Sequence, residues 1–301
     1  MVYLLLAAFC GALFSVIFKV CQRRGIDTMQ AIFFNYVTGI VTTWAPLLIH
    51  QATGGTEVVN PFAQRWIWLA LLLGFFFMNG FIVMAQSTKK CGVALTTVAA
   101  RASLIIPVIL SWLLLAGSAP KWIPVLLVLT ALVIIAFGQG NKANGLQKSG
   151  GRKWVLFFVV FFFYGICDFS LKAVQNSISQ QFGSDSALVN RQLTALTGTI
   201  FLMAALLSLT VVLLRPKSQR HPWSWKAAVA GIFLGLANLG CTTFILRSLT
   251  ILPAGTFFPL YNIAIVFLGI LAGLLVFKEK IKPMQYLGLL VAIVAIVLFF
   301  H

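Results

Sequence analysis

Few ionisable residues interrupt the long apolar runs of this sequence, and the first to consider is Asp168. It is the one acid, out of five in the chain, that lies well inside such a run. Lys172 follows four residues later, which places the two side chains one helical turn apart on the same face. A carboxyl group in this position can accept a proton or bind a cation. A local ion pair with Lys172 that only stabilises the helix is the alternative, and the sequence leaves both open.

Arg101 is the second ionisable residue in an apolar run, about midway through residues 92–115. A long basic side chain near a helix end can extend to the membrane surface, but one at the midplane must face a partner or a cavity. A role in substrate binding or gating and a role as a structural counter-ion both remain open. Lys19, Lys172 and Arg191 lie nearer to the ends of their runs, and extension to the surface is the simpler interpretation for Lys19 and Arg191.

Neutral polar residues form a third group of candidates within the apolar runs. Hydrogen bonds between helices explain such residues in many membrane proteins, and lining of a cavity is the alternative. With Arg101, the candidates for a substrate cavity are Asn35, Tyr36, Asn79, Tyr164, Asn238, Tyr261 and Asn262. The candidates for ion coupling or ion pairing are Asp168, Lys172 and Lys19.

The composition indicates that these residues belong to an all-α membrane protein. Hydrophobic residues make up 60% of the chain and charged residues 9%, where a soluble domain carries about a quarter charged residues. The net charge of +17 does not indicate nucleic-acid binding, because the basic residues lie in short loops between apolar runs. Residues 2–20 are long enough to span and no small-residue cleavage site follows, so we expect no cleavable signal peptide.

The cysteines and histidines do not indicate a metal or a disulfide framework. The five cysteines lie in or beside apolar runs, are odd in number and show no paired spacing. The three histidines lie in loops or at the end of the chain. We therefore expect neither a metal site nor a cofactor.

A membrane-spanning helix needs about 20 mostly apolar residues, and the chain contains about ten such stretches. They are residues 2–22, 28–49, 65–86, 92–115, 122–137, 154–174, 187–214, 225–246, 254–277 and 284–300. The fifth is short.

A polar connector divides these spans into two sets of five. Residues 138–153 are rich in Gly, Asn, Gln and Lys and cannot bury enough apolar surface to fold alone. The sequence after the connector resembles the sequence before it at a constant offset. The matched pairs include Gly74 with Gly235, Ser87 with Ser248, Arg101 with Asn262, and Lys121 with Lys282. We predict a five-helix repeat at 1–138, a cytoplasmic linker at 139–153 and a second five-helix repeat at 154–301.

The distribution of Lys and Arg predicts the orientation of the chain. Nearly all basic residues of the loops lie in the odd-numbered ones, which should therefore face the cytoplasm. Both termini should then lie outside. With five spans per half, the second repeat enters the membrane from the opposite side, which gives two inverted repeats around one central site.

Three segments of the chain resemble the drug/metabolite transporter superfamily in its ten-helix EamA-type form. Residues 164–172, which begin Tyr-Gly and end at Lys172, are similar to the Trp-Gly…Lys pattern that opens each half of that family. Gly11 and Lys19 repeat this pattern with one extra residue. Residues 275–288 are similar to the Gly-Glu…Gln…Gly pattern between the last two helices. The likeness covers the chain as a five-plus-five layout, and its degenerate motifs indicate a superfamily rather than a substrate.

The chain also departs from this family. The first half has Pro107 in its fourth span but Ser118 where the family often carries Glu, and the second half has Glu279 without a matching proline. The family usually has both termini inside, whereas the charge distribution here predicts the reverse.

The leading functional hypothesis is a secondary transporter that moves a small polar metabolite, of the amino acid or organic anion type, by alternating access. Proton coupling through Asp168 is an option within it. A membrane-embedded enzyme acting on a lipid-linked substrate is the alternative, but a single acid in the spans argues against catalysis. Charges inside the spans argue against a purely structural protein. We expect a monomer or homodimer in a bacterial cytoplasmic (inner) membrane, with a small-molecule substrate, the lipid bilayer and no nucleic acid as partners.

Overall fold

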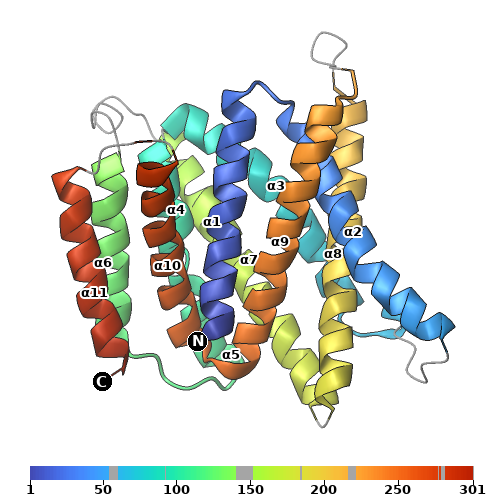
Figure 1. The fold of residues 1–301 in the computed structure, drawn as a ribbon. Coiled ribbons are helices and arrows are strands. Elements are labelled where there is room, and N and C mark those ends of the chain that lie inside the picture. Colours follow the sequence, from blue (N-terminus) through green and yellow to red (C-terminus); the bar gives the residue numbers. More distant parts are fainter. Residues whose placement is uncertain are drawn as a thin grey trace. The chain divides into compact units, whose positions relative to one another are not determined.

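The chain folds into helices and connecting loops. The structure is a computed structural model that describes residues 1–53, 60–91, 93–139, 152–183, 185–215, 222–276, 278 and 282–300. Most of the predicted linker at 139–153, together with Glu279, lies outside these residues. Helices are the regular elements of the described part of the chain (Figure 1). A bilayer offers no water to backbone groups, so an apolar stretch that crosses it must satisfy its own hydrogen bonds, as a helix does.

The helices are numbered in chain order. They are α1 (Val2–Arg23), α2 (Thr28–Ala52), the short 3₁₀ turn η1 (Pro61–Ala63), α3 (Ile67–Cys91), α4 (Val93–Ala102), α5 (Ile105–Leu114), α6 (Trp122–Gln139), α7 (Arg152–Phe182), α8 (Ser186–Leu213), α9 (Trp225–Ile251), α10 (Ala254–Leu275) and α11 (Pro283–Phe300).

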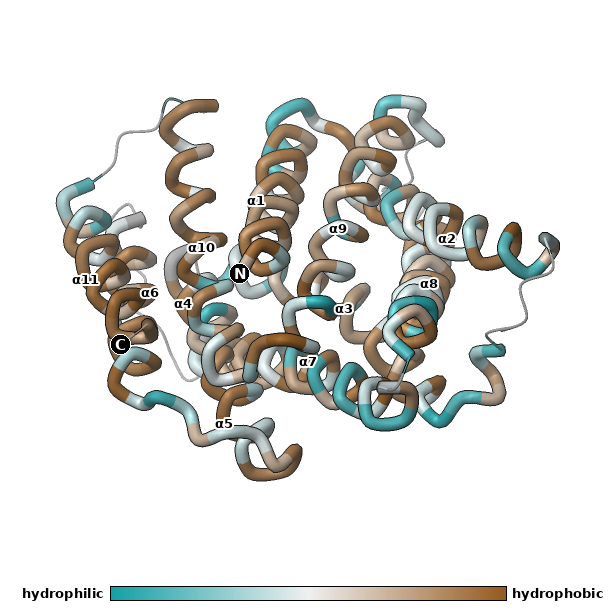
Figure 2. The backbone as a smooth tube through the Cα atoms, turned by 60° about the horizontal axis from the view of Figure 1, so that its bottom comes forward, coloured by the Kyte–Doolittle hydropathy of each residue, from teal (hydrophilic) through white to brown (hydrophobic). Residues whose placement is uncertain are grey.

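Within the described residues, nine segments are long and apolar enough to cross a membrane, and α4 and α5 together form one of them. The apolar part of α6, Trp122–Gly138, is a tenth and shorter segment, at the position of the short fifth span that the sequence predicts. Figure 2 shows α6 and α11 hydrophobic over nearly their whole lengths. The chain is thus an all-helical, multi-pass integral membrane protein.

Aspartate side chains fix the starts of two helices. Asp27 precedes α2, and its Oδ1 accepts hydrogen bonds from the backbone N–H groups of Met29 and Gln30 at 2.9 and 3.2 Å. Asp185 precedes α8 and accepts from the N–H groups two and three residues further on, at 2.7 and 3.1 Å. Each carboxylate satisfies backbone donors that have no partner within the first turn of the helix.

A proline breaks the fourth span. Pro107 lies in the first turn of α5, where it has no N–H to donate to the carbonyl of Ser103 and its ring would clash with that carbonyl. The chain makes tighter bonds instead, from Leu104 N–H to Arg101 O at 3.3 Å and from Ile106 N–H to Ser103 O at 2.9 Å. α4 therefore ends at Ala102, and α5 begins at Ile105.

The helices pack into two units, and each is described by itself. The first unit comprises residues Met1–Met78 and Val174–Thr250. In it α2 packs against α8, and the two helices run in opposite directions. The ion pair between Asp27, at the start of α2, and Arg215, just after α8, shows this direction, with 2.8 Å between Oδ2 and Nη1. Glycines bring these helices close together: Gly39 of α2 lies against Phe201, and a Cβ at Gly198 of α8 would lie 2.6 Å from the Thr43 hydroxyl oxygen.

The second unit comprises Asn79–Ala173 and Ile251–His301. In it α6 and α11 pack side by side and run in opposite directions (Figure 1). Lys121, just before α6, donates from Nζ to the carbonyl of Phe299 at the end of α11, at 3.0 Å. At the other end, a Cβ at Gly138 would lie 2.9 Å from Cγ of Gln285. α10 also packs against α5, and its Gly255 lies beside Val108.

All three of these helix pairs join spans of the same rank in the two predicted halves. α2 and α8 are the second span of each half, α5 and α10 belong to the fourth, and α6 and α11 are the fifth. Each unit therefore draws helices from both sides of the connector. The sequence predicts the repeat but not which of its members pack together.

Candidate functional site

Arg101 lies in the second unit, in the last turn of α4, next to the break before α5. Its side chain is half-buried, and Nη1 donates to Oδ1 of Asn262 on α10 at 3.1 Å. Asn262 is only 4% exposed, and its Nδ2 donates to the carbonyl of Phe258 at 2.9 Å. This second bond fixes the amide so that its oxygen faces the guanidinium. The structure thus pairs a charge inside an apolar segment with a neutral amide oxygen, which accepts one of the N–H donors of the guanidinium.

Asp168 and Tyr164 of α7 complete this cluster. The carboxyl group of Asp168 lies close enough to the Arg101 guanidinium for their charges to attract each other. The Tyr164 hydroxyl lies within electrostatic range of both and donates to the carbonyl of Gly80 on α3 at 3.3 Å. We call Arg101, Asn262, Asp168 and Tyr164 the Arg101 cluster. Its members come from three helices of one unit.

Close packing positions α7 against the broken span. Gly165, next to Tyr164, lies against the side chain of Ile106 in the first turn of α5, so any larger residue at 165 would separate the helices. A hydroxyl pair ties α3 to α4 on the other side, because Ser87 and Thr96 are both buried and their oxygens lie 2.8 Å apart. These contacts hold the two halves of the broken span, α5 against α7 and α4 against α3.

The structure divides the predicted site residues between the two units. The second unit also holds Tyr261, whose ring stacks on Phe257 at 5.3 Å between centroids, with Asn79 on α3 and Lys172 on α7. Lys172 is half-buried one turn after Asp168. A helix-stabilising pair of these two residues stays an alternative to a coupling role.

A second polar group lies in the first unit. Asn238 of α9 donates from Nδ2 to Oδ1 of Asn35 on α2 at 3.2 Å. The Nδ2 of Asn35 is buried, and among the described residues no acceptor lies within hydrogen-bonding distance of it. Tyr36 is fully buried with its ring 5.6 Å from that of Phe201. Lys19 belongs to this unit as well, half-buried on α1.

Sequence reasoning missed two polar contacts of this first unit. One is the Asp27–Arg215 ion pair, whose side chains are 9% and 20% exposed. An Asp followed by Thr at the start of an apolar run is a recognisable helix start, but nothing in the sequence identifies its distant arginine partner. The other is the bond from the Trp66 indole N–H to Gln192 Oε1 at 3.2 Å. Among the described residues no group of three or more His, Cys, Asp or Glu side chains could hold a metal ion.

Comparison with known proteins identifies the fold but no activity. No family model matches the chain. An uncharacterized protein of Haemophilus influenzae is 28% identical over 306 residues, which cover 97% of this chain and 95% of that protein. A solved crystal structure is similar with a TM-score of 0.68 and 15% sequence identity, and it covers 97% of this chain and 96% of the other. At that identity the likeness establishes a shared fold alone.

Proposed function

We propose that this protein is a secondary transporter of the EamA type, which carries a small anionic metabolite across the membrane by alternating access. The observation that carries the proposal is the Arg101 cluster. A guanidinium within a membrane-spanning segment is costly and is usually retained for a substrate or ion pathway. Asn262 satisfies it only in part, because an arginine has five N–H donors and the amide oxygen accepts one of them. The remaining donors suit a carboxylate or phosphate of the cargo.

The break in the fourth span supports a binding role for this place. Transporters commonly build their sites where membrane helices are interrupted near the midplane, because the freed backbone groups line a cavity. Here the interruption at residues 103–104 begins two residues after Arg101. Polar side chains and irregular backbone thus occur together within Leu95–Leu114, which by length and hydropathy is a single membrane span.

The helix pairing supports an inverted arrangement of the two halves. Helices of equal rank pack in opposite directions, as a two-fold axis in the membrane plane would place them. Arg101 and Asn262 are 161 residues apart and are matched to each other by the offset that aligns the halves. Equivalent residues that touch each other lie next to such an axis. The cluster would then lie beside the axis that relates the two halves, where transporters built from inverted repeats have their substrate sites.

The test is transport by purified protein in proteoliposomes. A panel of radiolabelled amino acids and organic acids is screened first by counterflow, which needs a cavity but no driving ion. We expect Arg101→Ala to weaken cargo binding by roughly 10–100-fold, since a hydrogen bond to a charged group contributes about 1.5–3 kcal/mol. Arg101→Lys should restore little if the cargo is held in a bidentate manner. Arg65→Ala is the matched control, because Arg65 is an exposed arginine outside the Arg101 cluster.

Proton coupling is tested with the same vesicles under a pH gradient. Asp168→Asn should abolish accumulation driven by the gradient and leave counterflow intact, because the cavity persists without the titrating carboxyl. If Asp168→Asn accumulated cargo under the pH gradient at the rate of the parent, Asp168 would have no role in proton coupling. Counterflow by Arg101→Ala at the parent rate, with the same elution profile on size-exclusion chromatography, would contradict the proposed site itself.

A further inference from the structure

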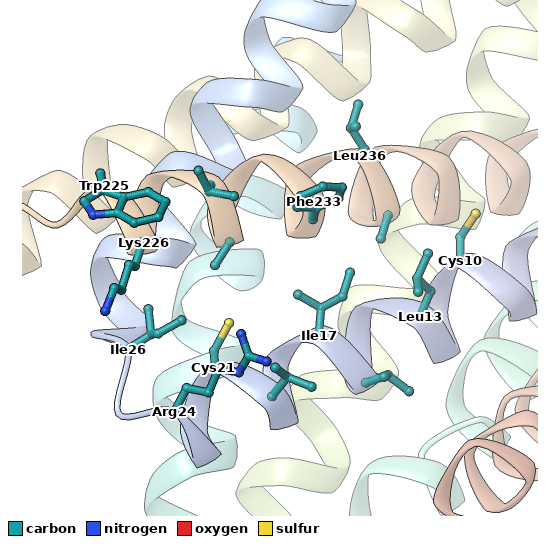
Figure 3. A pocket seen from close by; sticks show the side chains of 15 residues that line it. Cys10, Leu13, Ile17, Cys21, Arg24, Ile26, Trp225, Lys226, Phe233 and Leu236 are labelled. Atoms are coloured by element: carbon teal, nitrogen blue, oxygen red, sulfur yellow. The ribbon is translucent and has the colours of Figure 1, made fainter. Parts of the chain in front are cut away.

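The first unit contains a large groove between α1 and α9 that the proposed transport site does not use. Its volume is about 1050 Å³, which is at the upper end of the range for ligand pockets. Figure 3 shows side chains of both helices facing this space, with Trp225, Lys226, Ile26 and Arg24 towards one end and Cys10 towards the other. All of the lining residues belong to the first unit.

The lining is apolar along its length and basic at one end. Side chains such as Leu13, Ile17 and Phe233 form the walls of the groove. The two charged residues of the lining are Arg24, directly after α1, and Lys226, in the first turn of α9. Both are exposed. Trp225 is 72% exposed beside Lys226, as is typical of a residue at the membrane–water interface.

A glycine turn places Arg24 at this end. Gly25 has a φ of +64°, and the chain reverses there with bonds from Gly25 N–H to Gln22 O at 3.3 Å and from Ile26 N–H to Cys21 O at 3.0 Å. This is the motif that ends a helix with a glycine in the left-handed conformation. It returns Ile26 towards Cys21 and leaves Arg24 at the mouth of the groove.

The described residues around the mouth do not neutralise its positive charge. The nearby acid Asp27 already caps α2 and pairs with Arg215 at 2.8 Å. Among the described residues no ion pair involves Arg24 or Lys226. The charge distribution of the sequence also predicts that this end faces the cytoplasm. An apolar groove with two such cations at its interfacial end is complementary to an amphipathic anion.

The dimensions fit one leaflet of a bilayer. The lining on α1 runs from Cys10 to Arg24, which at the rise of a helix corresponds to ~20 Å. Half the hydrocarbon thickness of a bilayer is about 15 Å. A chain that entered at Arg24 and followed the groove to Cys10 would cover the depth of that leaflet.

We propose that this groove binds an anionic phospholipid, with its phosphate between Arg24 and Lys226 and an acyl chain along the apolar walls. Basic pockets between membrane helices on the cytoplasmic side are suited to such head groups. The inference does not depend on transport, because no member of the Arg101 cluster lines the groove.

The test measures lipid binding by native mass spectrometry on the full-length protein after removal of co-purified lipid. Phosphatidylglycerol and phosphatidylcholine with identical acyl chains are titrated separately. Each interfacial cation contributes about fivefold to the binding of an anionic lipid. The Arg24→Gln/Lys226→Gln variant should therefore bind phosphatidylglycerol about 25-fold more weakly and phosphatidylcholine within twofold of the parent. Lys90→Gln is the control, because Lys90 is an exposed cation in the last turn of α3 and does not line the groove.

A second variant tests the apolar part. Val229 lines the groove and is 42% exposed, so Val229→Trp should fill the space without disturbing the core and weaken both lipids. Equal affinity of the parent for the two lipids, or an equal loss in Lys90→Gln, would overturn the proposal. Displacement of the lipid by glycerol 3-phosphate at equal concentration would show a site for phosphate alone and would overturn it too. A further result would also overturn it: the parent forms a dimer, Val229→Trp dissociates that dimer, and lipid binding stays unchanged. The groove would then be occupied by a second copy of the chain.

Discussion

Asp27 should contribute to stability in two separable ways, and its counterpart Asp185 in only one of them. Both carboxylates cap a helix through two backbone N–H groups. Asp27 also accepts a hydrogen bond from Nη1 of Arg215 through Oδ2 at 2.8 Å, and the two side chains are only 9% and 20% exposed. The cap binds the start of α2, whereas the ion pair binds that start to the segment after α8. Substitutions can therefore remove one interaction and keep the other.

The structure sets the expected magnitudes. Loss of a helix cap costs about 1 kcal/mol, and asparagine caps about as well as aspartate. An exposed ion pair contributes at most about 1 kcal/mol, while breaking a buried one costs roughly 3–5 kcal/mol. At its intermediate exposure the Asp27–Arg215 pair should be worth ~2 kcal/mol. We expect losses of ~3 kcal/mol for Asp27→Ala, ~2 for Asp27→Asn and ~1 for Asp185→Ala, with little effect of Asp185→Asn.

The assay is the thermal unfolding midpoint of each purified variant in detergent, followed by tryptophan fluorescence. The midpoint should fall in the order Asp185→Asn, Asp185→Ala, Asp27→Asn, Asp27→Ala. Arg215→Gln combined with Asp27→Asn should be no less stable than the single Asp27 variant, because residues of one ion pair do not act additively. Equal midpoints for Asp27→Asn and the parent would refute the reasoning, since the ion pair would then contribute nothing to stability.

Three other outcomes are expected. Gly198→Leu should overpack α2 against α8 and lower the unfolding midpoint, at a cost of about 1–3 kcal/mol in stability. Gly269→Ala should change the midpoint little, because a Cβ at Gly269 meets nothing within 4 Å. Cysteines at Ile135 and Gly288 should form a disulfide under mild oxidation, because these positions of α6 and α11 are in contact, and failure to cross-link would argue against the antiparallel pairing. A reporter active only in the cytoplasm, fused after His301, should be silent, and strong activity would mean that the charge distribution does not determine the orientation.

The sequence predicts the helices well because a single physical constraint determines them. A span needs a certain length of apolar chain, and the limits that this gives, such as 28–49 and 122–137, lie close to those of α2 and α6. The positions of the connections between spans follow from the same rule, because each connection begins where an apolar stretch ends. The predicted termini, repeat symmetry and cargo remain predictions, because hydropathy carries no information on them.

The contacts of the site are harder to predict because they depend on distant residues. Arg101 stands out as a charge in an apolar run, yet its bond to Asn262 crosses 161 residues of chain. The break after Arg101 could have been predicted, because Pro107 cannot continue a hydrogen-bonded turn back to Ser103. Partners such as Arg215 for Asp27 follow only from which helices pack together.

The bond between Arg101 and Asn262 bears on why the two predicted halves are joined in one chain. These two positions are matched by the offset between the halves, and they touch. An assembly of two identical five-helix chains would bring the same residue to both sides of this contact, either two guanidinium groups that repel or two amides without charge. Joining the halves in one polypeptide allows the two sides to differ. Under the predicted repeat, a single charge at this contact therefore requires two halves of different sequence, which one polypeptide always supplies together.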